Sequence, residues 1–559
     1  MSDLPDEIAR INALTTNARN TWLVLLGVLV FVGITMMGVE HIDFYGVDRA
    51  TKLPLVSVDV PTRLFFVAAP ILTAAIYGYF HLYLIRLWDV LGAADARHNG
   101  HPLGEVITPW LVSDAALHYR ARKRRDFCVT ARAMETPAML LNIVLAWLFG
   151  LLILLFMWWQ SMPARNLLIT GIAALSLLAS LGVGTASYIM LTRRMLRKPV
   201  DPPDLNRSVP FLALVITAAC LILPLTVLRI TGIYEKSPFA FLRIATLSMV
   251  DEAIVERPKD WQPFEFARKQ YRAEWCDRQN INKCSDLGER QSDFAREWQS
   301  RHDTVLESMR RPDWHKFGRS KPNFREADLR GAFLSGANFF GANMESVQFR
   351  KAQMEGADFR NANLSRANFR KAKLQRANFR AATMDRIDLR HAQLDGANLS
   401  YAILKGAKLE YARMEDAVLN FSLITGQDDD KSDFKKVEIN AVTNSGGALR
   451  NIDLSRAIFG AQTDFRNTFL DGTVKHTERF RNQMQNPCQW IEDDLSDVEF
   501  YAYWHWWIEM NPGKNSHNNW ATIAPLEWRN VPLPTEEQLA KYNLTDCEWK
   551  TGPMPGATD

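Results

Sequence analysis

Residues 352–384 read AQMEGADFRNANLSRANFRKAKLQRANFRAATM, and every fifth position from Met354 onward is apolar. The same spacing extends in both directions, from Phe324 to Ile424, and gives 21 repeats whose central residue is Phe, Leu, Met or Ile. Ala stands two positions before the centre in 17 of the 21 repeats. This part of the chain therefore has one uninterrupted period of five.

A period of five fits neither regular secondary structure. In a helix each step of five turns the apolar residue by about 140°, and in a strand it changes the face each time. The chain must therefore turn once per repeat, and the apolar centres can be buried only if successive turns stack on one another. The pattern predicts a solenoid.

Individual repeats resemble the A(D/N)LXX signature of the pentapeptide-repeat protein family. The clearest are AlaAspLeuArgGly (327–331), AlaAsnPheArgLys (367–371) and AlaAsnLeuSerTyr (397–401). The resemblance implies a right-handed quadrilateral β-helix (a pentapeptide-repeat solenoid) with four repeats per coil, in which the centre and the Ala point inward. It says little about activity, because such repeats serve many binding roles.

Some members of this family are acidic mimics of DNA that bind topoisomerases. Residues 322–424 contain 16 Lys or Arg against 11 Asp or Glu, so the charge of this block has the wrong sign for DNA mimicry. We expect partners of another kind.

Four repeats per coil place residues 20 apart above one another, at the ~4.8 Å spacing of paired strands. One side of the predicted rod, the basic face, then carries the predicted binding residues Arg330, Arg350, Lys351, Arg370, Lys371, Arg390 and His391. The opposite side has Phe340, Arg360, Arg380 and Ser400 at the equivalent position, and the other two sides are acidic or neutral there. The basic face is either a solvated surface or a docking surface for lipid headgroups, a polysaccharide or an acidic protein.

The segments around the repeats are less regular. We expect residues 233–321 to form a connector with helices that cap the first coil, and residues 426–447 to loop out of a repeat domain spanning residues 322–474. After it, SerAspValGlu (496–499) has the pattern of a capping box that begins an aromatic helix, within a C-terminal cap of residues 475–559.

Five long apolar runs precede residue 230, at about 22–39, 64–85, 137–159, 167–192 and 209–229. Each approaches or exceeds the ~20 residues needed to cross a bilayer, and none has a charged residue in its interior. We therefore expect a five-span, multi-pass α-helical membrane domain at residues 21–232, after a polar N-terminal tail at residues 1–20. The few polar groups within the runs, such as Tyr77 and His81, do not indicate an ion path.

The basic residues between the runs predict the orientation. Loops 86–136 and 193–208 contain eight and five Lys or Arg, against three in residues 40–63 and one in residues 160–166. The positive-inside rule then places the two basic loops and the N-terminus in the cytoplasm. An odd number of spans exports everything after residue 230, which predicts a bacterial inner-membrane protein with a periplasmic repeat domain.

The cysteines are distributed unevenly along the chain. Cys128 and Cys220 lie before residue 230, whereas the other four, Cys276, Cys284, Cys488 and Cys547, all follow it. Four cysteines on the exported side suit two disulfides, and Cys276–Cys284 and Cys488–Cys547 are the natural pairs. Free thiols remain an alternative, while zinc is disfavoured because neither pair has a CxxC spacing.

No catalytic motif, cofactor-binding motif or metal-ligand set is present, so we predict that the chain is not an enzyme. The sequence favours a membrane-anchored scaffold that presents a rigid β-helix to a protein or an anionic ligand. The alternative is an envelope sensor or defence-type receptor that signals through loop 86–136. The partner's identity and the oligomeric state do not follow from the sequence.

Overall fold

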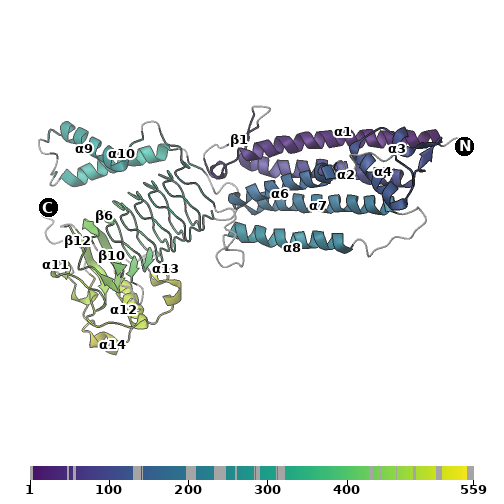
Figure 1. Ribbon diagram of the computed structural model, residues 1–559. Helices are drawn as coiled ribbons and strands as arrows, with labels where there is room; N and C mark the ends of the chain where they lie inside the picture. The colour runs from purple at the N-terminus through teal and green to yellow at the C-terminus, as the bar shows by residue number, and fades with distance from the viewer. Residues whose placement is uncertain are drawn as a thin grey trace. The chain divides into compact units, whose positions relative to one another are not determined.

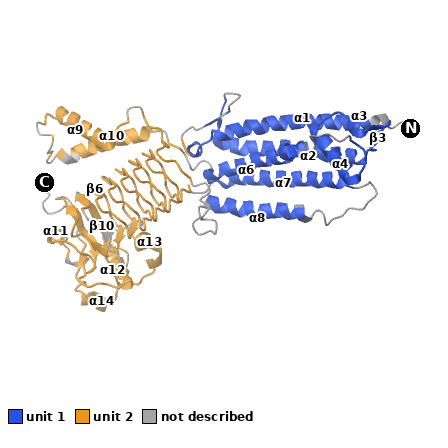
Figure 2. Ribbon diagram, in the orientation of Figure 1, with its two compact units in different colours: residues 1–44, 48–245 blue, residues 45–47, 246–559 orange. Residues whose placement is uncertain are grey.

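The computed structural model forms two compact units (Figure 2). The first contains residues 1–44 and 48–245, and the second contains residues 45–47 and 246–559. Within them, the structure describes residues 4–46, 50–53, 58–129, 137, 140–141, 143–196, 209–231, 247–258, 261–281, 284, 287, 290–309, 311–312, 322–426, 432–434, 436–440, 442–460, 463–481, 486–511 and 519–549.

The first unit is a bundle of long apolar helices. Among the described residues, five helices are long and apolar enough to cross a membrane, which suggests a membrane protein. They are α1 (Leu4–Met37), α2 (Thr62–Ala93), the π-helical turn η2 (Val144–Leu148) continued by α6 (Phe149–Ser161) and η3 (Met162–Ala164), α7 (Leu167–Leu196) and α8 (Val209–Thr231). Each expected run coincides with one of them. Helix α1 starts at Leu4, so the expected polar tail, residues 1–20, is helical from that residue.

Small residues let the helices of the bundle approach closely. The Tyr77 ring of α2 lies between Gly150 of α6 and Gly184 of α7, where a Cβ atom would come within 2.5 Å of it. The Tyr77 hydroxyl donates a hydrogen bond of 3.0 Å to the carbonyl oxygen of Trp147, in the π-helical turn. The small-residue stretch 180–187 thus serves helix packing, as membrane bundles generally require.

The long connection between α2 and α6 is folded where the structure describes it. It contains a short antiparallel pair, α3 and α4, and α4 packs against α7. Arg120 donates 2.6 Å to the carbonyl oxygen of Leu91, and Arg124 donates 3.0 Å to that of Gly92. Two of its basic side chains therefore hold the connection against the end of α2. The short elements of the first unit are η1 (His41–Phe44), β1 (Ala50–Lys52), β2 (Asp59–Pro61), β3 (Arg97–His98), β4 (His101–Pro102), α3 (Leu103–Val106) and α4 (Leu111–Arg124).

The second unit is built around a rod of stacked coils (Figure 1). Parallel β-bridges join residues 20 apart along the repeats, beginning with Asn323 to Asn343 and Asp328 to Gln348. The chain thus returns above itself after every four repeats. The centres are fully buried, and Phe349 and Phe369 lie one above the other with ring centroids 4.9 Å apart. Leu329 precedes them in the same column, since its N–H donates 2.8 Å to the carbonyl oxygen of Gln348.

The corners of the rod use left-handed backbone. The second residue after each centre from Phe324 to Leu419 has φ near +60°, for example 63° at Lys351 and 60° at Arg366. Gly suits this conformation best because it has no Cβ atom. Gly356 has two reasons to be glycine. Its φ is +65°, and a Cβ atom at this position would lie 2.2 Å from the Leu306 side chain.

One coil is longer than the others, and the expected loop 426–447 is wrong for most of its length. Strand β6 (Arg413–Glu415) pairs with β9 (Glu438–Asn440), 25 residues further on instead of 20. Residues 432–433, 438–440 and 443–447 therefore belong to paired strands of the rod. Residues 427–431 lie outside the described part of the chain. The remaining strands are β5 (Ile403–Lys405), β7 (Leu423–Thr425), β8 (Ser432–Asp433), β10 (Thr443–Arg450), β11 (Ile452–Asp453), β12 (Ile458–Phe459) and β13 (Asp464–Leu470).

The pairing also extends beyond the expected limits of the repeat domain. Before the repeats, Met249 and Ile254 donate backbone hydrogen bonds to Asp328 and Phe333, so residues 247–255 add part of a coil to the first one. After residue 474, Trp490 forms a parallel bridge with Leu470. Both segments also bury side chains, such as Met249, Ile254 and Ile491, but each is too short for the five-residue period to be recognised in the sequence.

The C-terminal helices pack on the last coils (Figure 1). The predicted capping box is present at Ser496 and Glu499, at the start of α12. Trp504 and Trp507 of this helix donate their indole N–H groups to the carbonyl oxygens of Gly446 and Asn467, at 3.1 and 2.9 Å. The aromatic helix therefore covers the end of the rod. The elements here are α11 (Glu478–Arg481), η7 (Pro487–Gln489), α12 (Asp497–Glu509), α13 (Trp520–Ile523), η8 (Leu526–Trp528) and α14 (Glu536–Lys541).

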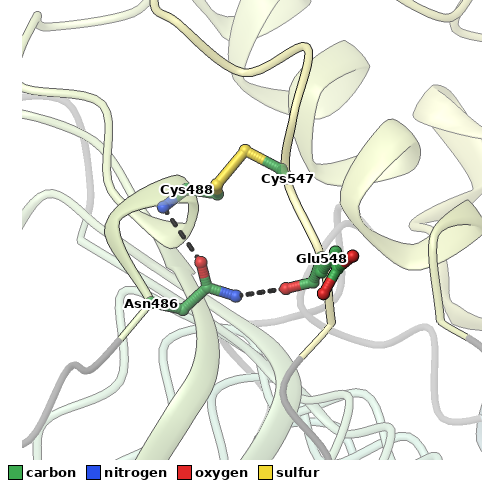
Figure 3. The surroundings of a disulfide bond; sticks show 4 residues. All are labelled: Asn486, Cys488, Cys547 and Glu548. Atoms are coloured by element: carbon green, nitrogen blue, oxygen red, sulfur yellow. Dashed lines mark hydrogen bonds between the residues drawn. A yellow bond between two sulfur atoms is a disulfide. The ribbon is translucent and has the colours of Figure 1, made fainter.

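Two disulfides join the cysteine pairs named from the sequence. Cys276 is bonded to Cys284 and Cys488 to Cys547, each pair with a Cα–Cα distance of 5.8 Å. Figure 3 shows the second bridge, where Asn486 accepts a hydrogen bond from the Cys488 N–H and donates one to the carbonyl oxygen of Glu548. This bridge fastens the last described segment of the chain to the end of the rod. Cys128 and Cys220 are free.

Candidate functional site

The structure brings the residues of the basic face together on one side of the rod. The N–H groups of Gly331, Lys351 and Lys371 donate 3.0 Å hydrogen bonds to the carbonyl oxygens of Arg350, Arg370 and Arg390. Arg330, Arg350, Arg370 and Arg390 therefore follow one another in successive coils. Lys351, Lys371 and His391 occupy the adjacent corner, with φ between 59° and 63°.

The two ends of the basic face are neutralised. Arg330 pairs with Asp328 at 2.7 Å and Arg390 with Asp388 at 2.6 Å, both through two guanidinium nitrogens. Burial alone would raise the pKa of Asp388, but the hydrogen bonds from Arg390 lower it below its ordinary value. His391 stacks on Tyr411 with ring centroids 4.8 Å apart. These residues are largely satisfied within the protein.

The middle of the face differs because Gln348 and Asn368 replace the carboxylates. Asn368 donates 3.0 Å to Gln348, so the two amides bond to each other instead of pairing with a guanidinium. Four cations, the central basic patch, remain without a salt bridge to any described residue: Arg350, Lys351, Arg370 and Lys371. Of the seven predicted residues, these four therefore have charges that no described carboxylate compensates. The residue before each centre, compared every 20 positions, distinguishes the two cases: Asp328 and Asp388 at the ends, Gln348 and Asn368 in the middle.

A helical hairpin covers the neighbouring side of the rod. It consists of α9 (Phe264–Arg278) and α10 (Gln291–Ser308), with Cys276–Cys284 near its tip. The hairpin lies along the rod and does not cap the first coil, in contrast to the expectation from sequence (Figure 1). Its ion pairs reach the rod over several coils, including Arg376–Asp303 at 2.6 Å and Arg413–Glu265 at 2.8 Å.

Under the hairpin lies a buried polar column. Ser335, Glu355 and Gln375 are fully buried, and Asp395 is 3% exposed. Glu355 accepts one long hydrogen bond, 3.5 Å from the Phe264 N–H, and its Oε2 atom has no partner among the described residues. Burial raises the pKa of Glu355 to about 7, against smaller opposing effects of the Phe264 N–H and Lys373. The docked hairpin therefore favours the protonated form of the Glu355 carboxyl.

We predict that hairpin docking weakens as the pH rises. Because the pKa of Glu355 is about 7 in the docked state and 4.5 ordinarily, the docked state holds more protons between these values. Its stability therefore falls from about pH 4.5 to about pH 7, by about 3 kcal/mol in all. Glu355→Gln should remove this dependence, and hydrogen exchange of α9 and α10 at pH 8.5 should slow by roughly a hundredfold relative to wild type.

The control for this experiment is Glu307→Gln, which changes an exposed carboxyl on the same hairpin. It should leave the exchange rates at pH 5 and pH 8.5 unchanged. Equal protection of wild type and Glu355→Gln at pH 8.5, after correction for intrinsic exchange, would show that Glu355 does not control docking.

The described part of the chain contains no group of three or more His, Cys, Asp or Glu placed to hold a metal ion. The ionisable groups described above form ion pairs, exposed cations or isolated buried carboxyls.

Comparison with known proteins agrees with the repeat pattern. The family model described as pentapeptide repeats matches in eight copies, over residues 323–355, 348–390, 372–410 and 382–420. No curated protein matches the chain.

Several solved structures resemble the repeat region. QnrB1, a plasmid-mediated fluoroquinolone resistance protein, is 20% identical over 29% of this chain and 86% of its own, with a TM-score of 0.16. HetL, a protein of the cyanobacterium Nostoc involved in heterocyst differentiation regulation, is 20% identical over 27% and 84%, with a TM-score of 0.14. A pentapeptide repeat protein from the thylakoid lumen of Arabidopsis thaliana is 22% identical over 20% and 68%, with a TM-score of 0.12. Their functions do not transfer at these levels of similarity.

The repeats imply a right-handed β-helix, consistent with the 20-residue spacing of the bridges. Residues 323–420 thus consist of pentapeptide repeats. Members of this family often interact with other proteins.

Proposed function

We propose that the protein is a membrane-anchored scaffold whose repeat domain binds an acidic partner through the central basic patch. The observation that supports this most directly is the charge distribution along one side of the rod. Asp328 and Asp388 neutralise its ends, whereas Arg350, Lys351, Arg370 and Lys371 have no carboxylate partner among the described residues. Uncompensated like charges at strand spacing repel one another, and an anionic partner relieves this repulsion.

The rod suits this role because its side chains are presented on a rigid frame. Each cation stands on backbone that is hydrogen-bonded to the coils above and below it, as the N–H groups of Lys351 and Lys371 illustrate. A preorganised array loses less conformational entropy on binding than a flexible loop does. In the proposed mechanism, the fixed spacing of the charges recognises the partner, and no reaction is catalysed.

We further propose that the repeat domain of this protein lies in the periplasm of a bacterial cell, behind a five-span inner-membrane anchor. Both disulfides follow the last candidate span, and the free Cys128 and Cys220 precede its end. Disulfides persist in oxidising compartments. The odd number of candidate spans and the excess of basic residues in loops 86–136 and 193–208 support the same placement.

Charge removal tests the proposal for the central basic patch. In the full-length protein in nanodiscs of zwitterionic lipid, replacing Arg350, Lys351, Arg370 and Lys371 by Gln should weaken binding to immobilised polyglutamate or polyuronate by about thirtyfold. Four exposed charge pairs of about 0.5 kcal/mol each account for this loss. The measurement is biolayer interferometry at two salt concentrations.

The matched control is Arg360→Gln with Arg380→Gln, which removes two cations from the opposite side of the rod. It should retain the affinity of the wild type. An equal loss in both variants would indicate nonspecific attraction, and an unchanged affinity after removal of the central basic patch would contradict the proposal.

The alternative receptor function has one supporting observation in the first unit. Phe127, beyond α4, exposes 72% of its surface next to exposed Arg122, Lys123 and Arg125. An exposed aromatic ring among cations is a suitable contact for a cytoplasmic partner. If the protein is a receptor, the substitution Phe127→Ser should abolish its output signal while the repeat domain stays folded.

A further inference from the structure

The rod has a groove of about 450 Å³ on the side that contains Glu345, Ser365 and Asp385. This side lies two repeats further along each coil than the side under the hairpin and is therefore opposite to it. The groove spans successive coils, and its lining is polar throughout: Glu345, Asn363, Ser365, Arg366, Asp385, Arg386, Lys405 and Gly406. The volume falls in the range of small-molecule sites, which is roughly 300–1,000 Å³. The exposed central basic patch belongs to a different side of the rod and contributes nothing to this lining.

The charge of the groove differs from the expectation for this side. The column that contains Glu345, Ser365, Asp385 and Lys405 predicts an acidic or neutral side. The next column, at the corner, adds Arg366 and Arg386, with φ of 60° and 54°. Their N–H groups donate to the carbonyl oxygens of Asp385 and Lys405, at 2.7 and 2.6 Å, which places the two arginines in adjacent coils.

These cations are not compensated within the groove. Arg366, Arg386 and Lys405 are exposed, and none has a salt bridge to another described residue. Glu345 is engaged by Arg325 at 3.2 Å. Within the lining, Asp385 remains as a counter-charge, and burial and nearby Glu527 of η8 raise its pKa; the three cations still outnumber these two carboxyls. The groove therefore attracts an anion.

Asp385 provides a second, directional feature. Its Oδ1 atom is buried and has no hydrogen-bond donor among the described residues. The groups that act on it are Lys405 and Arg386, and Glu527 of η8. A buried carboxylate oxygen without a donor is costly, and a hydroxyl group of a ligand would satisfy it. Ser365 lies in the same column one coil earlier and offers a further hydroxyl contact.

We propose that this groove binds a small hydroxylated anion, of the class of sugar acids and sugar phosphates. The oxyanion lies between the guanidinium groups of Arg366 and Arg386, which suit carboxylate and phosphate oxygens through paired N–H donors. Lys405 adds a third positive charge. Asp385 accepts a hydrogen bond from a ligand hydroxyl. The site is independent of the partner surface proposed above.

Isothermal titration of the full-length protein in detergent, with glucuronate, glucose 6-phosphate, inorganic phosphate and glucose, tests the proposal. We expect glucuronate or glucose 6-phosphate to bind and neutral glucose not to bind; which of the two anions binds identifies the oxyanion. Arg366→Gln with Arg386→Gln should weaken that binding by about a hundredfold, since each charge-assisted contact contributes about 1.5 kcal/mol.

Two further variants make the result specific. Arg360→Gln with Arg380→Gln, on the side opposite the basic face and outside the groove lining, removes the same charge and should leave the affinity unchanged. Asp385→Asn removes the same negative charge for both ligands but the carboxylate acceptor for the sugar hydroxyl alone, so it should lower the affinity for the sugar anion about tenfold relative to that for inorganic phosphate. The proposal is overturned if neither sugar anion binds the wild type, if the two double variants lose affinity equally, or if Asp385→Asn changes the two ligands alike.

Discussion

Replacing Phe359 by Ala should lower the free energy of unfolding of the repeat domain by about 3–5 kcal/mol. The Phe359 ring is fully buried and stacks between Phe339 and Phe379, with centroids 5.1 and 4.9 Å away. Its removal opens a cavity that the coils above and below cannot fill, because their backbones are fixed by hydrogen bonds on every side. Urea unfolding of the full-length protein in detergent, followed by circular dichroism, measures the loss.

Phe340→Ala is the matched control, because Phe340 directly follows the buried Phe339 in the chain, yet its own side chain is 41% exposed. It should cost less than about 1 kcal/mol, mainly the contact of its ring with Arg360 at 5.5 Å. Equal effects of the two substitutions would contradict the assignment of Phe359 to the interior column. Hydrogen exchange should also show that the damage at Phe359 spreads to adjacent coils, since each coil is stabilised mainly by its neighbours.

Removal of the disulfide between Cys488 and Cys547 should destabilise the C-terminal end by about 4 kcal/mol. The bond closes a loop with a sequence separation of 59, and the loss of chain entropy in the unfolded state grows with loop length. The Cys488→Ser and Cys547→Ser double variant should therefore show a lower melting temperature and faster hydrogen exchange in α12. Asn486 should also lose its hydrogen bond to Glu548, because the last segment is no longer fastened beside it.

The other disulfide provides the comparison. Cys276 and Cys284 are separated by only eight residues, so their replacement by Ser should cost less, about 2–3 kcal/mol, and should affect α9 and α10 but not α12. Two results would contradict this explanation by loop entropy. One is an equal loss of stability on removal of either disulfide, and the other is faster hydrogen exchange in α12 after removal of Cys276–Cys284.

The interior of the rod could be predicted from the sequence because one local rule determines it. A turn every five residues places Leu329, Phe349 and Phe369 in one column, and the structure has them there. The 25-residue coil was missed because polar Asp429 and Asn444 stand where the period places apolar centres. Phe434 and Ile439 nevertheless keep the five-residue phase and are buried.

The hairpin α9–α10 was beyond prediction for a different reason. Its side chains contact residues about 75 to 150 positions away, such as Asp303 with Arg376 and Glu265 with Arg413. An amphipathic helix shows in its sequence that it packs on something, but not on which side of a rod. The position of Glu355 under the hairpin, and hence its altered pKa, follows only from the tertiary structure.

The candidate binding residues lie between these extremes. Reading one column every 20 residues gave the basic face, but the partners Asp328 and Asp388 stand two positions earlier in each repeat. Arg366 and Arg386 stand one position later than the column used for their side of the rod. All four residues could have been found from the sequence by comparing every outward position, since the period alone determines which of them are neighbours.

The short segment 247–255 affects whether the repeat domain associates with other copies of itself. By donating to Asp328 and Phe333, it occupies backbone groups that would otherwise be open to any passing strand. Stacked coils with a bare terminus are templates for end-to-end growth into fibres. A recombinant fragment should therefore begin before residue 247 rather than at the first repeat, since the shorter piece would expose an edge that polymerises.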